Sequence, residues 1–221
     1  MAQARKFLRV ASALAVTSLA VNASACADRL EPPVPQTYKE VDTMRQWAES
    51  RAEPYGIPSR QLAAYAYAAK KVDEDSGCSV GWPTLAALGS VLSDHGRANE
   101  TTIDDAGITS TKLRHLAPAA EGRSEVPDTD AGMIDGDKHQ DVPVGPLQIM
   151  PSRWEQFAIA VEPGSTPNPD SIDDSALTTA VILCNSGDLS SPEVWVSAMS
   201  KINPHPDFLT AVHTKAQEYS R

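Results

Sequence analysis

The chain has 221 residues, of which 41% are hydrophobic and 22% are charged, and this composition is typical of a soluble globular domain with flanking segments. Its formal net charge is -10 at pH 7. Such a charge repels nucleic acid and anionic lipid headgroups, so we expect neither as a partner.

The first 25 residues have the organisation of an export signal. Three basic residues within the first nine precede the uncharged run VASALAVTSLAV and the small residues Ala-Ser-Ala at 23–25. The apolar run is too short to cross a bilayer as a mature helix. Removal of residues 1–25 would leave 16 Lys and Arg against 29 Asp and Glu, a net charge of -13. We therefore expect an extracytoplasmic protein of the cell envelope.

The three cysteines divide into one pair and one remaining residue. Cys78 and Cys184 lie in the region that we expect to fold, and they form the natural disulfide in an exported protein. A bond across 106 residues would contribute roughly 4–5 kcal/mol in the chain-entropy treatment. Cys26 directly follows the cleavage-like site. It would either carry a lipid that anchors the protein to the membrane or become a free N-terminal thiol after simple cleavage.

Between the signal and the main domain, the sequence predicts a linker and a weak helix over residues 26–54. The segment 31–36, EPPVPQ, has the composition of an extended spacer. The following segment 37–53 is helix-like but weakly amphipathic. We expect the compact domain to run from residue 55 to residue 221.

Within this domain, proline near the start of a segment and glycine near its end mark short helices. A long polar insertion, 98–144, separates the second expected helix from the third, and no run of residues is typical of a strand. The fold class is therefore mainly α. The expected helices are 57–72, 82–96, 150–161, 171–187, 191–202 and 206–220.

Five motifs in a fixed order resemble those of a known family. They are SDHGR at 93–97, PDTDAGMIDGD at 127–137, VGPLQIMPSRW at 144–154, SIDDSALTTAVILC at 171–184 and SKIN at 200–203. Together they are similar to motifs of the actinobacterial lytic transglycosylases, which are secreted enzymes that cleave peptidoglycan to 1,6-anhydro products. The resemblance covers roughly Ile57 to Tyr219 and implies a lysozyme-like domain with a long loop insertion. The family also has cysteines at the two paired positions.

The position of the family's catalytic residue is occupied by Leu92. In the family, a glutamate precedes the Ser-Asp-His-Gly-Arg motif and protonates the leaving oxygen of the glycosidic bond. A leucine side chain cannot carry a proton, and loss of general acid–base catalysis costs about 10²–10⁴-fold in rate. Leu92 continues an apolar stripe with Leu85 and Leu88, which is typical of core packing. We expect no intact catalytic residue.

Four nearby or flanking residues are candidates to replace the missing acid. Asp94 lies about 200° around the helix from position 92, and His95 lies about 60° from it. Glu100 and Glu125 belong to the insertion. We expect none of them to act as the acid, although a slow enzyme that uses one of them remains an alternative.

The remaining family motifs imply a glycan-binding cleft. Gln148 matches a Gly-x-Met-Gln pattern in which Leu147 replaces Met; the alternative is a simple turn before the helix at Pro151. The family's Tyr-Asn pair is Ile202-Asn203 here, which removes a hydroxyl and a stacking face. The residues that the resemblance places at the glycan are Ser93, Gly145, Gln148 and Asn203.

The acidic residues Asp128, Asp130, Asp135 and Asp137 suggest oxygen ligands for calcium. Their spacing is not that of an EF-hand, because no glutamate closes the loop at the twelfth position. The family has nearly the same string, so a structural loop is the preferred interpretation. The five histidines show no metal-ligand spacing. We expect no metal and no cofactor.

The sequence therefore predicts an exported peptidoglycan-binding protein that has lost catalysis. Peptidoglycan glycan strands are the expected partner, with another cell-wall hydrolase or envelope protein as a second one. One alternative is an active or slow lytic transglycosylase. Another is an interaction module that binds a second envelope protein and no longer uses its cleft.

Overall fold

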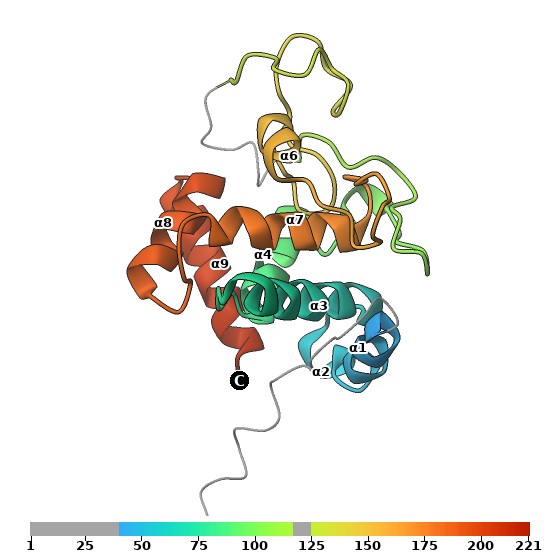
Figure 1. Ribbon diagram of the computed structural model, residues 1–221, viewed down its shortest axis with the longest axis vertical. Coiled ribbons are helices and arrows are strands. Elements are labelled where there is room, and N and C mark those ends of the chain that lie inside the picture. The colour runs from blue at the N-terminus through green and yellow to red at the C-terminus, as the bar shows by residue number, and fades with distance from the viewer. Residues whose placement is uncertain (1–39, 117–124) are drawn as a thin grey trace, which may run out of the picture. The chain divides into compact units, whose positions relative to one another are not determined.

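The computed structural model describes residues 40–116 and 125–221, and these are mainly helical (Figure 1). The expected signal, Cys26 and the spacer 31–36 lie outside the described residues. No described helix is long and apolar enough to cross a membrane. The elements are α1 (Glu40–Glu49), α2 (Ala52–Tyr55), α3 (Ser59–Ser76), α4 (Trp82–Ser93), η2 (Ala98–Glu100), α6 (Pro151–Phe157), α7 (Ile172–Cys184), α8 (Pro192–Ile202) and α9 (Pro206–Tyr219).

The six expected helices correspond to α3, α4, α6, α7, α8 and α9. Four of these, namely α4, α6, α8 and α9, have a proline in the first turn, where its fixed φ suits the helix and its missing N–H costs nothing. Between the helices, the described loops of the insertion contain only isolated β-bridges, such as that between Val144 and Ile149.

Three helices, α4, α6 and α7, end three or more residues earlier than the sequence indicates, and α7 ends at Cys184. The helix α4 ends at Ser93 because Asp94, His95 and Gly96 all adopt positive φ, at 50°, 56° and 80°. The helix α6 ends at Phe157 rather than near residue 161. The amide of Val161 donates a 2.8 Å hydrogen bond to the carboxylate of Asp174 instead of continuing the helix.

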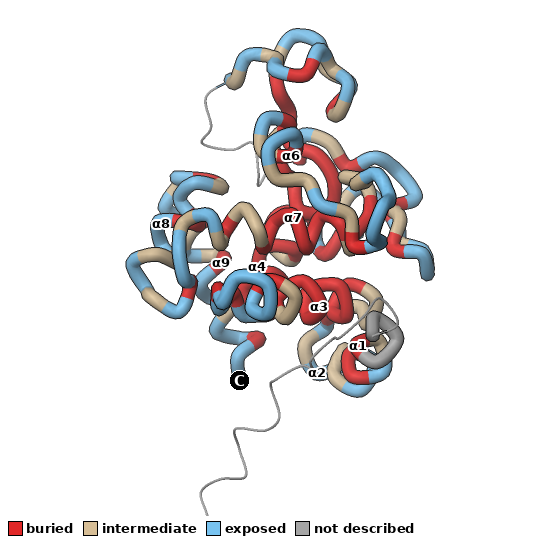
Figure 2. The backbone as a smooth tube through the Cα atoms, in the orientation of Figure 1, coloured by how far each residue is buried: buried red, intermediate tan, exposed pale blue. Residues whose placement is uncertain are grey.

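The helix α3 lies at the centre of the described fold and packs against α1, α4 and α7, while α4 also packs against α9. Figure 1 shows α3 and α7 crossing the view one above the other, and Figure 2 shows buried backbone along both. Leu62, Leu85, Leu88 and Leu92 are fully or almost fully buried. The apolar stripe of α4 is therefore core, as its periodicity indicates.

The compact part of the chain begins earlier than residue 55. The side chain of Met44 on α1 is fully buried, and Trp47 packs edge-to-face on Trp82 with ring centroids 5.8 Å apart. The segment that the sequence assigns to a linker and weak helix thus contributes α1 to the core. Its few apolar residues suffice because two of them are large and lie on one face.

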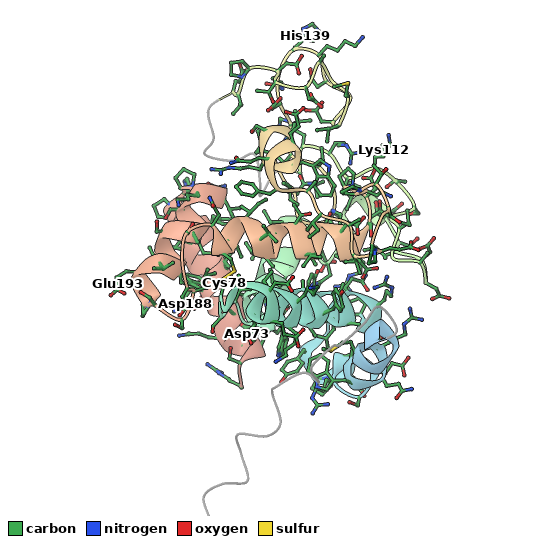
Figure 3. All side chains as sticks on the ribbon, viewed as in Figure 1. Asp73, Cys78, Lys112, His139, Asp188 and Glu193 are labelled. Atoms are coloured by element: carbon green, nitrogen blue, oxygen red, sulfur yellow. A yellow bond between two sulfur atoms is a disulfide. The ribbon has the colours of Figure 1, made fainter. Side chains whose placement is uncertain are left out.

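The expected disulfide is confirmed. Cys78 and Cys184 are bonded, with their Cα atoms 5.9 Å apart (Figure 3). The bond joins the segment after α3 to the last residue of α7. It therefore ties together two helices that also pack along their length.

Candidate functional site

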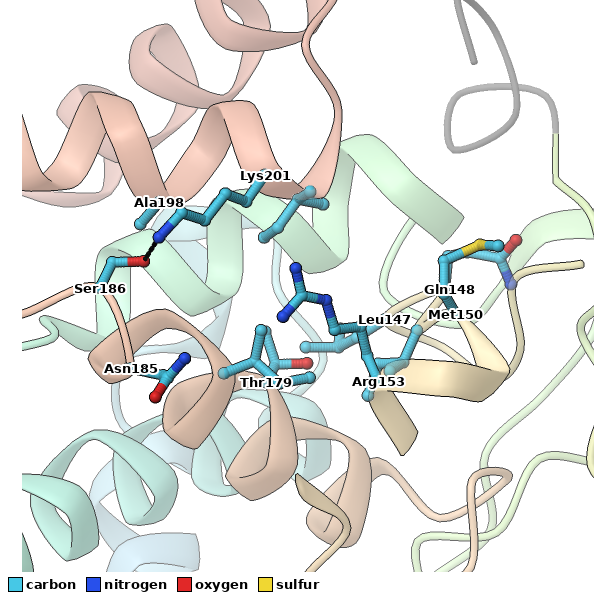
Figure 4. Close-up of a pocket in the computed structure, with 12 residues that line it drawn as sticks. Leu147, Gln148, Met150, Arg153, Thr179, Asn185, Ser186, Ala198 and Lys201 are labelled. Carbon is cyan, nitrogen blue, oxygen red and sulfur yellow. Dashed lines mark hydrogen bonds between the residues drawn. The ribbon is translucent and has the colours of Figure 1, made fainter. Parts of the chain in front are cut away.

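A small pocket, open to solvent, is bounded by the turn 147–150 and by α6, α7 and α8 (Figure 4). We refer to it as the α6–α7–α8 pocket. Its apolar lining includes Leu147, Met150, Ile182 and Ile202. Its polar lining consists of Gln148, Arg153, Thr179, Asn185, Ser186 and Lys201. A concave apolar site with a few polar groups is the usual form of a small-ligand site.

Three of the five family-like motifs meet in this pocket. Leu147 and Gln148 come from VGPLQIMPSRW, Thr179 comes from SIDDSALTTAVILC on α7, and Ile202 comes from SKIN at the end of α8. The position at which the family has a tyrosine thus faces the same space as the glutamine. Ile202 presents only an apolar surface there.

Gln148 lines the pocket, but its side chain is used to hold the turn. It is 1% exposed, and its backbone adopts the left-handed region at φ 48°. Its Oε1 accepts a 2.8 Å hydrogen bond from the amide of Leu116, and its Nε2 donates at 2.7 Å to the carbonyl of Gly145. The amide group is therefore satisfied by backbone, which agrees with the alternative of a turn residue.

Gly145 does not line the pocket. Its φ is 73°, and a Cβ at this position would lie 1.9 Å from the carbonyl oxygen of Pro169. Only glycine allows the turn to approach the segment before α7 so closely. Its role in this structure is to place the turn, rather than to contact a ligand in the pocket.

Ser93 and Asn203 are also buried away from the pocket lining. The hydroxyl of Ser93 donates at 2.5 Å to the carbonyl of Pro146 and accepts at 2.8 Å from the amide of Gly96. It thereby fastens the end of α4 to the turn. The side chain of Asn203 accepts a 2.9 Å hydrogen bond from the amide of His205 just before α9. Of the four expected glycan-binding residues, only Gln148 lines the pocket.

Leu92 is 1% exposed and belongs to the core rather than to the pocket lining. None of the residues that line the pocket in the described chain is Asp or Glu. Asp94, Glu100 and Glu125 are exposed and lie outside this lining. The carboxylate of Asp94 instead forms an exposed ion pair with Arg97 at 2.7 Å.

His95, the remaining candidate acid, lies inside the protein. It is 2% exposed, and its Nδ1 and Nε2 lie 3.3 Å and 3.2 Å from the hydroxyls of Tyr65 and Tyr219. Burial, with a smaller contribution from the positive charge of Arg97, lowers the pKa of His95 to about 4. The imidazole is therefore neutral at pH 7 and joins three helical regions through its hydrogen bonds.

Apart from Gln148, the polar residues of the pocket were not singled out by the sequence; Arg153, Lys201 and Thr179 are three of them. Arg153 is half-buried, Lys201 is exposed, and Thr179 is 3% exposed. Lys201 lies within SKIN and Arg153 lies within VGPLQIMPSRW, so their positive charges inside these motifs were a signal in the sequence. Thr179 gives no such signal, because a threonine on a buried helix face looks like any other core residue.

The acidic loop brings together a different set of carboxylates from the one that the sequence suggests. Asp128, Asp130 and Asp141 offer oxygens within 4.8 Å of one another, whereas Asp135 and Asp137 are not part of this group. Asp141 accepts hydrogen bonds from the amide and hydroxyl of Thr129 at 2.8 Å and 2.7 Å. These hydrogen bonds stabilise the conformation of the loop. The expectation that the loop holds no metal stays a prediction.

No protein-family model, curated protein or solved structure matches the chain. The family resemblance therefore rests on the motifs themselves.

Proposed function

We propose that this protein is an exported peptidoglycan-binding protein with a lysozyme-like domain, which holds glycan strands in the α6–α7–α8 pocket without cleaving them. One observation carries the proposal. Residues of three motifs that resemble those of lytic transglycosylases line the same pocket, and no carboxyl group of the described chain lines it with them.

The chemistry of the lining suits a carbohydrate. Sugars present hydroxyl and amide groups at their edges and C–H groups on their faces. The pocket opposes these with the amide of Asn185, the hydroxyl of Ser186 and the apolar side chains of Met150 and Ile182.

The same geometry supports binding without turnover. Cleavage of a glycosidic bond requires a group that protonates the leaving oxygen within hydrogen-bond reach. Leu92 occupies the family's acid position and is buried in the core. His95 is enclosed by tyrosines and is neutral at pH 7.

The proposal is tested by binding of the purified mature protein to peptidoglycan sacculi in a pull-down. Ile202→Trp fills the pocket from α8, and we expect it to weaken retention at least about tenfold. Val196→Trp is the matched control, because Val196 lies on the same helix, is 44% exposed and does not line the pocket. Thermal denaturation would verify that both variants fold.

We expect the wild type and the Val196→Trp variant to be retained equally. Equal retention of all three proteins would contradict the α6–α7–α8 pocket as the site. Failure of the wild type to bind would contradict the proposed function itself.

A further inference from the structure

The guanidinium of Arg153 points into the α6–α7–α8 pocket without a charged partner among the residues that the structure describes. Figure 4 shows it between the walls of the pocket, and no carboxylate of the described residues forms an ion pair with it. By contrast, the similarly enclosed Arg114 is paired with Asp170 at 2.6 Å. A half-buried arginine has five donors in a fixed fork, which suits a planar anion.

Two further groups of the pocket lack a strong partner. The Nζ of Lys201 donates to the hydroxyl of Ser186 at 2.9 Å, and no carboxylate of the described chain pairs with it. The hydroxyl of Thr179 is buried without any hydrogen-bond partner among the described residues. Thr179 lies beside Arg153 in Figure 4. A buried hydroxyl without a partner in a pocket is costly unless a ligand satisfies it.

The sign of the local charge is opposite to that of the whole chain. The protein has a net charge of -10, yet the described lining of this pocket contains two cations and no acid. Solvent-exposed positive charge of this kind attracts small anions and repels cations. The positive charge of the lining, the Thr179 hydroxyl and the Arg153 guanidinium, which have no strong partner among the described residues, together favour an anionic ligand group.

We propose that the pocket recognises a carboxylate on the muramyl unit of the glycan, and that Arg153 determines this specificity. The inference rests on the proposed function and adds the ligand group that the pocket selects. Arg153 binds the carboxylate with two parallel N–H donors, Lys201 contributes a second charge, and Thr179 donates its hydroxyl. The carboxylate belongs either to the lactyl group of a peptide-free strand or to the stem peptide.

Calorimetric titration with matched ligands tests this inference. Three probes distinguish the sources: peptide-free glycan strands with free lactyl groups, disaccharide–peptide muropeptides, and neutral chitotetraose. Each carboxylated probe is also converted to its primary amide, which preserves its size and removes its charge. We expect at least one carboxylated probe to bind about tenfold to a hundredfold more tightly than its amide.

Three variants assign the effect to residues. Arg153→Gln is expected to bind the carboxylated probe and its amide with equal affinity. Thr179→Val is expected to bind the carboxylated probe more weakly than the wild type does and to show a smaller preference for it over the amide. Lys71→Gln is the control for loss of one charge, because Lys71 pairs with Asp75 on α3 and lies outside the pocket. It should bind like the wild type.

Equal affinity of the wild type for carboxylates and amides would overturn the inference while leaving glycan binding intact. Unchanged selectivity in Arg153→Gln would overturn the role of Arg153. Binding of no probe, including chitotetraose, would overturn both this inference and the proposed function.

Discussion

The environment of His95 and the α6–α7–α8 pocket both contain polar groups, but the two regions use them in opposite ways. Around His95, each ring nitrogen faces a tyrosine hydroxyl within hydrogen-bond distance, and the whole cluster is buried. In the pocket, Arg153 has no ion-pair partner among the described residues, and Thr179 has no hydrogen-bond partner. Satisfied polar groups stabilise a fold, whereas unsatisfied ones that line a pocket are available to a ligand.

This difference separates the residues that stabilise the fold from those that are available to bind a ligand. His95 belongs to the motif that resembles a catalytic signature, yet its contacts are those of a structural residue. Arg153 is not among the expected glycan-binding residues, yet its surroundings are those of a binding residue. Mutations in each of the two regions test this difference.

The largest effect on the free energy of unfolding is expected for Leu92→Glu, which tests whether position 92 belongs to the core or to the pocket. Because Leu92 is 1% exposed, a glutamate there would be desolvated, and its pKa in the folded protein would rise. We expect a loss of about 4 kcal/mol in the free energy of unfolding at pH 7, measured by urea denaturation. The loss should shrink as the pH falls towards the unfolded pKa of about 4.3, because both states then bind the proton.

Leu92→Gln is the control for Leu92→Glu, since it has the same shape and does not titrate. Equal stability of the two variants at pH 7 would show that position 92 reaches pocket water and could hold a charged acid. That result would mean that Leu92 belongs to the pocket rather than to the core.

The second effect concerns the pH dependence of stability through His95. Its pKa is about 4 in the folded protein and about 6.5 in the unfolded chain, so the unfolded state takes up a proton first as the pH falls. Stability from the neutral imidazole is complete above pH 6.5 and is lost progressively between pH 6.5 and 4. The expected loss is roughly 3 kcal/mol, measured as the change in unfolding free energy with pH.

The contribution of His95 is isolated by comparison with His95→Gln, which retains a polar side chain but cannot titrate. The variant should be less stable than the wild type at pH 7 and should show a smaller dependence on pH between 6.5 and 4. An identical pH dependence in the two proteins would place His95 in contact with solvent and contradict its structural role.

The smallest effect is expected for Arg153→Gln on stability. Because no protein anion of the described chain pairs with Arg153, its removal should change the free energy of unfolding by no more than about 0.5 kcal/mol. Arg114→Gln is the comparison, because it breaks a mostly buried pair with Asp170 and should cost about 2 kcal/mol. Equal losses in the two variants would mean that Arg153 serves the fold as Arg114 does.

Much of the helical architecture is predictable from the sequence, because local signals determine it. Prolines such as Pro151 and Pro192 mark helix starts, and the position of Cys78 and Cys184 within the folding region indicates their bond. The early end of α4 is harder to predict from the sequence. It requires Asp94 and His95 in the left-handed region, which few non-glycine residues adopt.

The candidate site is less predictable than the fold, because side-chain partners come from distant segments. Gln148 and Ser93 look like ligand-binding residues in the sequence, but backbone groups of Leu116 and Pro146 satisfy them. The importance of Arg153 depends on an absence of nearby acids, and no local pattern in the sequence reports that absence. Only the folded arrangement separates these two cases.

We propose that the α6–α7–α8 pocket binds peptidoglycan and does not cleave it. The most direct test of this proposal incubates the purified mature protein with sacculi and measures, in one sample, the bound protein and the soluble products by mass spectrometry. Sacculi digested with lysozyme confirm that the substrate can be cleaved. We predict retained protein and no 1,6-anhydro muropeptides, whereas release of anhydro products by the wild type would contradict the account.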